Sequence, residues 1–112
     1  MHNIKYSNQA EIDLEKAISY IAKDSKQNAI SYLLRYEEKI ELLKLNPNMG
    51  VECKNKLINR DCRVLVHESH IIVYRVDTNT NNILIIRIFH SYEEYKSKLN
   101  GKITNDTSYI YV

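Results

Sequence analysis

The order of hydrophobic patterns along this chain leaves few folds open. Residues 62–90 are rich in Ile, Val and Leu and read as three consecutive strands, and two segments with helical periodicity precede them. The predicted helices and strands are, in order, Gln9–Lys23, Lys26–Leu45, Cys62–His67, His70–Val76 and Ile83–Phe89. Because the links between neighbours are short, we expect an antiparallel helical hairpin packed on an antiparallel β-meander.

Polar residues predict where the helices begin and end. Ser7 and Asn8 are both good N-caps for the first helix, and Asn8 with Glu11 forms a capping-box-like start. Ser25 can cap the second helix. The segment 46–50, Asn-Pro-Asn-Met-Gly, ends that helix because proline cannot continue it and glycine permits a turn.

The faces of these elements predict what is buried. In the first helix, Asp13 lies off the apolar stripe, so we expect its carboxylate to face solvent. The last strand is apolar on both faces. One face would carry Leu84, Ile86 and Ile88, and the other Ile83, Ile85 and Phe89. The helical hairpin can cover one face of such a strand, and a partner protein could cover the other.

Two further elements are expected near the ends of the chain. Asn3–Tyr6 is a candidate strand, and Ser91–Leu99 is a candidate short helix with Ser91 as its N-cap. The 112 residues amount to one domain. We therefore expect a single α+β domain over residues 1–99, with residues 100–112 as a C-terminal tail.

The charge balance argues against a strongly basic nucleic-acid-binding protein. The formal net charge is only +2, although Arg63, Arg75 and Arg87 give the predicted sheet a local excess of positive charge. The first residues contain no apolar signal-peptide region, and no apolar run approaches the ~20 residues of a membrane span. These features predict a cytoplasmic protein without membrane contact.

The cysteine and histidine spacings do not predict a metal site. Cys53 and Cys62 are the only cysteines, and they form no CxxC pattern. We expect them to be free thiols in a reducing cytosol. The four histidines have no carboxylate partner at a metal-ligand spacing. No metal or other cofactor is therefore expected.

Polar side chains gather on one face of the predicted meander, where we expect a two-residue turn at Glu68-Ser69. The facing pairs on that side are then Arg63 with Tyr74, Leu65 with Ile72, and His67 with His70. His90 closes the third strand. Arginine, histidine and tyrosine on one sheet can bind phosphate, stack on bases or perform general acid–base chemistry on RNA.

Each of these residues also has an ordinary structural explanation. Tyr74 fits a core tyrosine with a hydrogen-bonded hydroxyl, and Arg63 could pair with Asp61 or Glu52. The two histidines beside the turn could be solvated, and His90 could bond to the backbone. Arg75 and Arg87 could be ordinary surface arginines.

Several short motifs follow one another along the chain. The first helix contains A-x-x-D-L-x-x-x-I-x-Y-I, the second contains A-x-x-Y, and N-P-x-x-G follows it. The strands contain C-R-V-L, S-H-I-I-V-Y-R-V and I-I-R-I-F-H. The helical and turn motifs use Ala10, Asp13, Leu14, Ile18, Tyr20, Ile21, Ala29, Tyr32, Asn46, Pro47 and Gly50. Over about residues 3–99, this pattern resembles the RelE/ParE superfamily of toxin–antitoxin toxins, and its ParE branch in particular.

The resemblance implies a RelE/ParE-like fold and a cognate ParD-like antitoxin that neutralises the toxin in a hetero-oligomer. ParE-like toxins are not nucleases and act on DNA gyrase, which they trap on cleaved DNA. RelE-like toxins are ribosome-dependent mRNA endoribonucleases, and an arginine on their second sheet strand stabilises the cleaved phosphate. Ile71 stands at that position here, and an isoleucine cannot neutralise phosphate charge. We therefore expect a gyrase inhibitor.

Two sets of site residues follow from the resemblance. For binding of the target or the antitoxin, the expected residues are Arg63, His70, Tyr74, Arg75, Arg87 and His90. In the alternative, a ribonuclease acting on ribosome-bound mRNA, the catalytic candidates are Arg63, His90, Tyr92 and Tyr95. A third hypothesis is a decayed toxin that has lost its activity and still binds its antitoxin.

Overall fold

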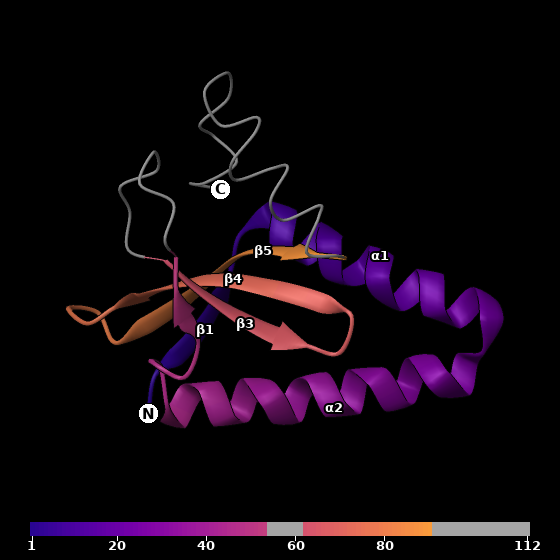
Figure 1. The fold of residues 1–112 in the computed structure, drawn as a ribbon, viewed down its shortest axis with the longest axis horizontal. Coiled ribbons are helices and arrows are strands. Elements are labelled where there is room, and N and C mark those ends of the chain that lie inside the picture. Colours follow the sequence, from indigo (N-terminus) through magenta and orange to yellow (C-terminus); the bar gives the residue numbers. More distant parts are fainter. Residues whose placement is uncertain (54–61, 91–112) are drawn as a thin grey trace, which may run out of the picture.

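The computed structural model describes residues 1–53 and 62–90 of the chain. Figure 1 shows its elements, which are β1 (Asn3–Tyr6), α1 (Asn8–Asp24), α2 (Lys26–Leu45), β2 (Val51–Glu52), β3 (Arg63–His67), β4 (His70–Asp77) and β5 (Asn82–Phe89). The predicted helical hairpin and the three long strands are present, with bounds that differ by at most one residue. The predicted helix over Ser91–Leu99 and the tail over residues 100–112 lie outside the described residues.

All five strands form one sheet in the order β1-β5-β4-β3-β2. β3, β4 and β5 pair antiparallel, which confirms the predicted meander, and β2 extends its edge. β1 pairs parallel with β5, so the sheet as a whole is mixed. The parallel pairing arises because the chain leaves β1 through the helical hairpin and returns to the opposite edge of the sheet.

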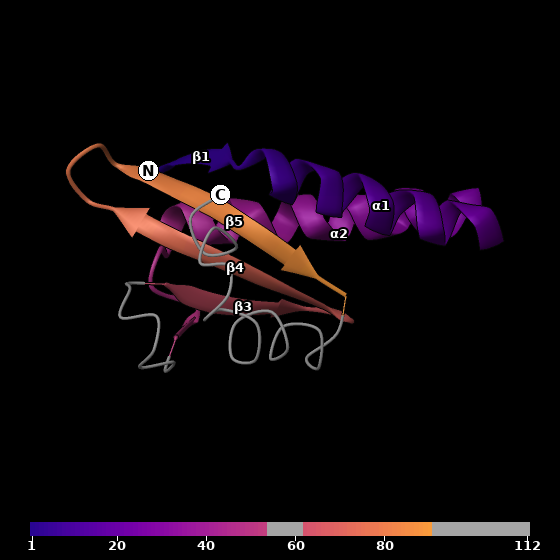
Figure 2. The same cartoon turned by 90° about the horizontal axis from the view of Figure 1, so that it is seen from above.

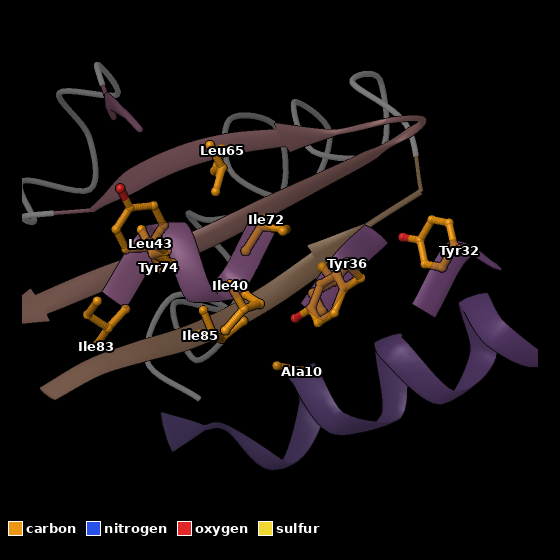
Figure 3. Close-up of a cluster of buried hydrophobic side chains, with 11 residues drawn as sticks. Ala10, Tyr32, Tyr36, Ile40, Leu43, Leu65, Ile72, Tyr74, Ile83 and Ile85 are labelled. Atoms are coloured by element: carbon orange, nitrogen blue, oxygen red, sulfur yellow. The ribbon is translucent and has the colours of Figure 1, made fainter. Parts of the chain in front are cut away.

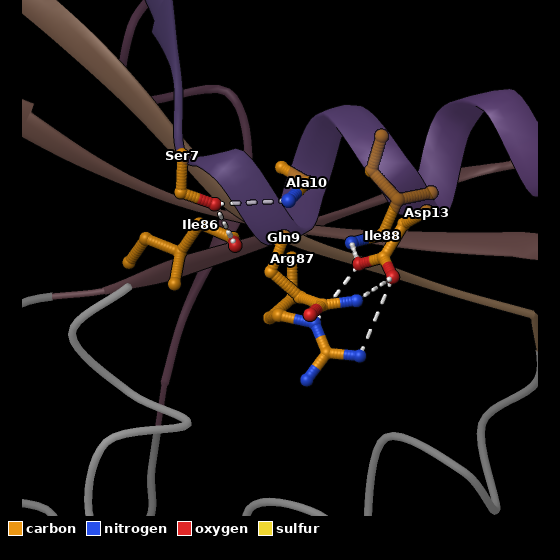
Figure 4. A network of polar contacts seen from close by, with 7 residues as sticks. All are labelled: Ser7, Gln9, Ala10, Asp13, Ile86, Arg87 and Ile88. Atoms are coloured by element: carbon orange, nitrogen blue, oxygen red, sulfur yellow. Dashed lines mark hydrogen bonds and ion pairs between the residues drawn. The ribbon is translucent and has the colours of Figure 1, made fainter.

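Serine side chains cap both helices. Ser7 Oγ accepts a hydrogen bond from the Ala10 N–H at 2.9 Å, and the same hydroxyl donates to the Ile86 carbonyl oxygen at 2.7 Å (Figure 4). Ser7 rather than Asn8 is therefore the N-cap of α1. Its hydroxyl also joins the start of the helix to β5. Ser25 caps α2 as predicted and accepts from a backbone N–H of the first turn at 3.1 Å.

The helical hairpin covers one face of the sheet (Figures 1 and 2). Figure 3 shows the core between these layers, where Tyr36, Ile40 and Leu43 of α2 meet Ile72 of β4 and Ile85 of β5. Leu43, Ile72 and Ile85 are fully buried. Burial of such a side chain stabilises a fold by about 1.5–3 kcal/mol relative to exposure, so this layer supplies much of the stability.

A β-bulge interrupts the pairing of β4 with β5. The register shifts between Val73 and Tyr74, where Ile86 is left without a partner in the register. Beyond the bulge, Ile88 packs in the core under the helices and Phe89 packs on the opposite face. The assignment of these two residues to faces from strict alternation was therefore wrong, because an inserted residue reverses the alternation.

The face of the sheet that lies away from the helices is also apolar. Its buried residues are Cys62, Ile71, Val73, Ile86 and Phe89. With the helix-side cluster, this confirms that β5 is an apolar strand buried on both faces.

The expectation that Cys53 and Cys62 are free thiols was wrong, because they form a disulfide. β2 pairs antiparallel with β3, and the Cys53 N–H donates to the Cys62 carbonyl oxygen at 2.9 Å. This pairing brings their Cα atoms to 5.3 Å, within the range for a disulfide. Spacing in sequence could not reveal this, because β2 is only two residues long and carries no strand pattern. Neither described helix is long and apolar enough to span a membrane.

Candidate functional site

Three side chains from separate elements form a hydrogen-bonded line, which we call the histidine line. The Tyr32 hydroxyl of α2 lies 2.8 Å from Nδ1 of His70, the first residue of β4. Nε2 of His70 lies 3.5 Å from Nδ1 of His90, which follows β5. Tyr32 and His70 are buried, whereas His90 is exposed. The line therefore runs from the core to the surface.

The β3–β4 turn positions His70 opposite His67, in the predicted register. Glu68 in this turn has a left-handed φ of 56°, and its carboxylate accepts from the Arg35 guanidinium of α2 at 2.6 and 3.1 Å. The turn is thus held against α2, and both histidines are only 4% exposed. The alternative in which they are solvated is wrong, because the two imidazoles pack against tyrosine rings of α2 while only the turn residues themselves are exposed.

His67 packs between two tyrosine rings of α2. Its ring centroid lies 5.2 Å from that of Tyr32 and 5.8 Å from that of Tyr36. Its Nε2 is buried without a hydrogen-bond partner among the described residues, and a Glu68 carboxylate oxygen lies 3.5 Å away. Burial lowers the pKa of His67, so the fold accommodates the neutral imidazole.

Burial also sets the protonation states along the histidine line. It raises the pKa of Tyr32 to about 12, so the hydroxyl stays protonated and is able to donate to Nδ1 of His70, 2.8 Å away. Burial lowers the pKa of His70, and the neighbouring His90 and His67 lower that pKa further. A neutral His70 that accepts at Nδ1 carries its hydrogen on Nε2, the atom that faces His90.

A pocket of about 420 Å³ opens beside the exposed end of the histidine line. The described residues that line it are Asp13, Lys16, Ala17, Tyr20, His70 and His90. Lys16 and Tyr20 lie one turn apart on α1, and both are exposed. The Tyr20 ring stands edge-on to the His90 imidazole, with the centroids 6.0 Å apart. An ammonium, an imidazole and an open aromatic ring therefore border a common space.

Asp13 is the centre of a buried polar network (Figure 4). Its carboxylate accepts from Nε of Arg87 at 2.9 Å, from the Ile88 N–H at 2.9 Å and from Nε2 of Gln9 at 3.0 Å. The side chains of Asp13 and Arg87 are 7% and 8% exposed. The expectation that Asp13 faces solvent was therefore wrong, because its side of α1 packs against β5. The Arg87 guanidinium also lies over the Phe89 ring, 4.7 Å from its centroid.

Tyr74 and Arg63 form a second polar cluster, at the far end of the sheet. The buried Tyr74 hydroxyl donates to the Pro47 carbonyl oxygen at 2.8 Å and accepts from the Gly50 N–H at 2.9 Å, which confirms the core tyrosine. The half-buried Arg63 donates to the Gly50 carbonyl oxygen at 2.8 Å and lies 3.5 Å from Glu52, one of its two expected partners. These contacts fix the turn that ends α2.

The structure does not gather the six predicted binding residues into one site. His70 and His90 meet in the histidine line, Arg63 and Tyr74 lie in the second cluster, and Arg87 pairs with Asp13. Arg75 is exposed on β4, beside a separate hollow of about 480 Å³ that Lys5 also lines. The ribonuclease candidates Tyr92 and Tyr95 lie outside the described residues.

Sequence reasoning missed four residues of the pocket and the line as site residues. They are Asp13, Lys16, Tyr20 and Tyr32. The first three recur at helical spacing on one side of α1, and this periodic polar face was the available signal. Within residues 1–53 and 62–90, no group of His, Cys, Asp and Glu is arranged to hold a metal ion.

Comparison with solved structures shows the same fold in known toxin–antitoxin proteins. A chain of the chromosomal ParDE system from P. aeruginosa superposes with a TM-score of 0.63 at 21% identity, covering 81% of this chain and 97% of that chain. A chain of the toxin–antitoxin complex RelBE2 from Mycobacterium tuberculosis superposes with a TM-score of 0.54 at 18% identity, covering 80% of this chain and 96% of that chain. At these identities the likeness concerns the fold.

The comparison of sequences with protein families is more specific. No curated protein matches the chain. Residues 4–95 match the family described as the ParE toxin of the type II toxin–antitoxin system parDE, which spans β1 to β5 and the histidine line. The chain therefore belongs to the ParE toxin family of the RelE/ParE superfamily, as its motifs indicated.

Proposed function

We propose that this ParE-family toxin inhibits DNA gyrase and is neutralised by a cognate ParD-like antitoxin. The choice of gyrase as the target rests on Ile71. This residue stands where the ribonuclease branch has its phosphate-stabilising arginine. Ile71 is 6% exposed and packs in the apolar cluster with Val73, Ile86 and Phe89. An aliphatic side chain offers no charge to an RNA phosphate, which favours the gyrase-directed branch.

Arg87 does not replace the missing arginine. Its guanidinium is bonded to the Asp13 carboxylate and lies over the Phe89 ring. A cation already paired with a buried carboxylate contributes little net charge to a phosphate. Of the predicted binding residues, Arg75 and His90 are the exposed ones, so they are the first candidates for contact with gyrase.

An apolar hollow between β1 and the helical hairpin is our candidate for an antitoxin surface. Its volume is about 550 Å³, and its half-buried apolar residues are Ile4, Tyr6, Leu14 and Leu33. Among the described residues, three exposed carboxylates border it, from Glu11, Glu15 and Glu37, against one ammonium, that of Lys5. Charge complementarity therefore favours an antitoxin segment whose apolar side chains are flanked by Lys or Arg.

A charge reversal tests this surface. Glu11→Lys combined with Glu15→Lys should weaken antitoxin binding, measured by calorimetry with the purified antitoxin. Glu38→Lys is the matched control, because Glu38 is an exposed carboxylate on α2 that does not line the hollow. Equal antitoxin affinity for the double variant and the control would place the antitoxin elsewhere.

An experiment in cells separates the two target classes. Gyrase trapped on cleaved DNA leaves double-strand breaks, so induction of this chain should switch on a DNA-damage reporter while a reporter mRNA stays intact. Co-expression of the antitoxin should suppress the damage signal. Growth arrest with cleaved mRNA and a silent damage reporter would refute the gyrase proposal.

The ribonuclease alternative is supported by one observation, the exposed imidazole of His90 at the end of the histidine line. In that case mRNA cleavage would require the ribosome and would be lost in His90→Ala. If the chain bound the antitoxin and caused no growth arrest, the decayed-toxin hypothesis would hold instead.

A further inference from the structure

We propose that the pocket beside His90 binds one nucleotide unit of a nucleic-acid strand, with the phosphate on His90 and Lys16 and the base on the Tyr20 ring. The residues come from two elements, α1 and the end of β5, which the Asp13–Arg87 pair holds together. Only the source of the strand rests on the proposed function, under which it is the DNA held by gyrase.

In the proposed site, the histidine line sets His90 as a hydrogen-bond donor to the phosphate. The tautomers are part of the proposal: the Tyr32 hydroxyl donates to Nδ1 of His70, 2.8 Å away, and the Nε2–H of His70 donates to Nδ1 of His90, 3.5 Å away. A neutral imidazole that accepts at Nδ1 carries its hydrogen on Nε2. Tyr32 and His70 are therefore positioning residues, because they select the tautomer in which His90 presents an N–H to an acceptor.

The charges around the pocket favour an oxyanion. Asp13 also lines it, but its carboxylate accepts from Arg87, the Ile88 N–H and Gln9, so the adjacent guanidinium compensates its charge. The Lys16 ammonium has no ion-pair partner within the described part of the chain. An ammonium and an imidazole N–H together suit a phosphate group.

The aromatic ring favours a nucleotide over a simple anion or an acidic side chain. Tyr20 is 69% exposed and lies beside His90. An exposed tyrosine next to a phosphate-binding cation is the arrangement by which proteins bind single strands, since each base stacks on a ring with about 1–3 kcal/mol. A carboxylate of a protein partner would use the cation and leave the ring without a role.

The tautomer of His90 is the first test, read from the ¹⁵N chemical shifts of its imidazole. The native protein should show a hydrogen on Nε2 and none on Nδ1. Tyr32→Phe removes one oxygen atom and should convert His90 to a mixture of tautomers. Tyr36→Phe is the matched control, because Tyr36 is equally buried on α2 and its hydroxyl bonds to Tyr6 instead. A hydrogen on Nδ1 in the native protein, or an unchanged Nε2–H form in Tyr32→Phe, would overturn the positioning.

Titrations with inorganic phosphate and with a short single-stranded oligothymidylate test the ligand. Phosphate should shift the His90 resonances saturably, and Lys16→Gln should abolish this shift, while Lys23→Gln on the same helix should not. The oligothymidylate should bind more tightly than phosphate. Tyr20→Leu should weaken the oligothymidylate at least about fivefold, the lower limit of the stacking energy, and leave phosphate unchanged.

Three results would overturn the nucleotide site. One is the absence of a saturable shift with either ligand. Another is equal binding of acetate and phosphate with no preference for the oligothymidylate, which would indicate an acidic protein segment. The third is an oligothymidylate affinity that Tyr20→Leu does not change. None of these measurements contains gyrase, so failure of the gyrase proposal would leave this site standing, and failure of the site would leave that proposal standing.

Discussion

The buried ion pair between Asp13 and Arg87 supports a quantitative prediction. Breaking such a pair from one side typically costs about 3–5 kcal/mol, because the remaining charge stays in a low-dielectric site. Asp13→Asn keeps one oxygen that can accept from the Ile88 N–H, so we expect the lower end, about 3 kcal/mol of unfolding free energy. For a domain of this size, that loss lowers Tm by on the order of 10 °C.

Urea denaturation followed by circular dichroism measures this loss, and an unchanged m-value shows that the denatured state is unaltered. Glu15→Gln is the matched control, because Glu15 is an exposed carboxylate on the same helix, and it should change stability by less than about 0.5 kcal/mol. Arg87→Met should also destabilise, and the double variant should lose about 2 kcal/mol less than the sum of the single losses. A loss below about 1 kcal/mol for Asp13→Asn would refute the assignment of the network as a stabilising link between α1 and β5.

Three further predictions concern the histidines, the disulfide and Gly50. Burial lowers the pKa of His67 and of His70 in the folded state. In the unfolded chain the histidine pKa is about 6.5, so below that pH the unfolded state binds more protons than the folded state. The free energy of unfolding should therefore be full above about pH 6.5 and should fall as the pH drops below that value. The fall should reach up to about 1.4 kcal/mol per pH unit for each histidine. Urea titrations at pH 7.5 and 5.5, in the native protein and in His67→Gln, measure this fall. The non-reduced protein should take up no thiol label. The double variant Cys53→Ala, Cys62→Ala should lose about 2–3 kcal/mol of unfolding free energy, which is the loop-closure contribution of a disulfide between cysteines nine positions apart in sequence. Gly50→Ala should cost about 1–3 kcal/mol by denaturation, because the added Cβ would lie 2.7 Å from the Tyr74 hydroxyl oxygen and 2.8 Å from the Val64 carbonyl oxygen. A stability that does not change between the two pH values, a reactive thiol in the non-reduced protein, or a neutral Gly50→Ala would contradict the corresponding contact.

Local patterns predicted the fold well, because its main elements carry strong periodic signals. The two helices and the three meander strands follow from hydrophobic spacing and short links, and the turn at Glu68-Ser69 gave the observed pairing of His67 with His70. The parallel pairing of β1 with β5 could not be read this way, because it joins residues about eighty positions apart. The bulge at Ile86 could not be predicted either, because it is defined by the pairing of β5 with β4 and not by the sequence of β5 alone.

The candidate site was predicted less well, because its chemistry arises from contacts between distant elements. His70 and His90 were identified on the strands, but their partner Tyr32 lies on α2 and was noted only within a motif. Asp13 was assigned to solvent because a helix alone does not show which of its sides packs on the sheet. The disulfide was missed because β2 forms only through its pairing with β3.

The measurement that most directly tests the central claim uses purified components. The chain is incubated with DNA gyrase, supercoiled plasmid and ATP, and the enzyme is then denatured to reveal any cleaved DNA. We predict linear plasmid that requires both gyrase and the chain and that disappears when the antitoxin is added in equimolar amount. Absence of linear plasmid, from protein that arrests growth in cells, would contradict the account and direct attention to the ribosome and His90.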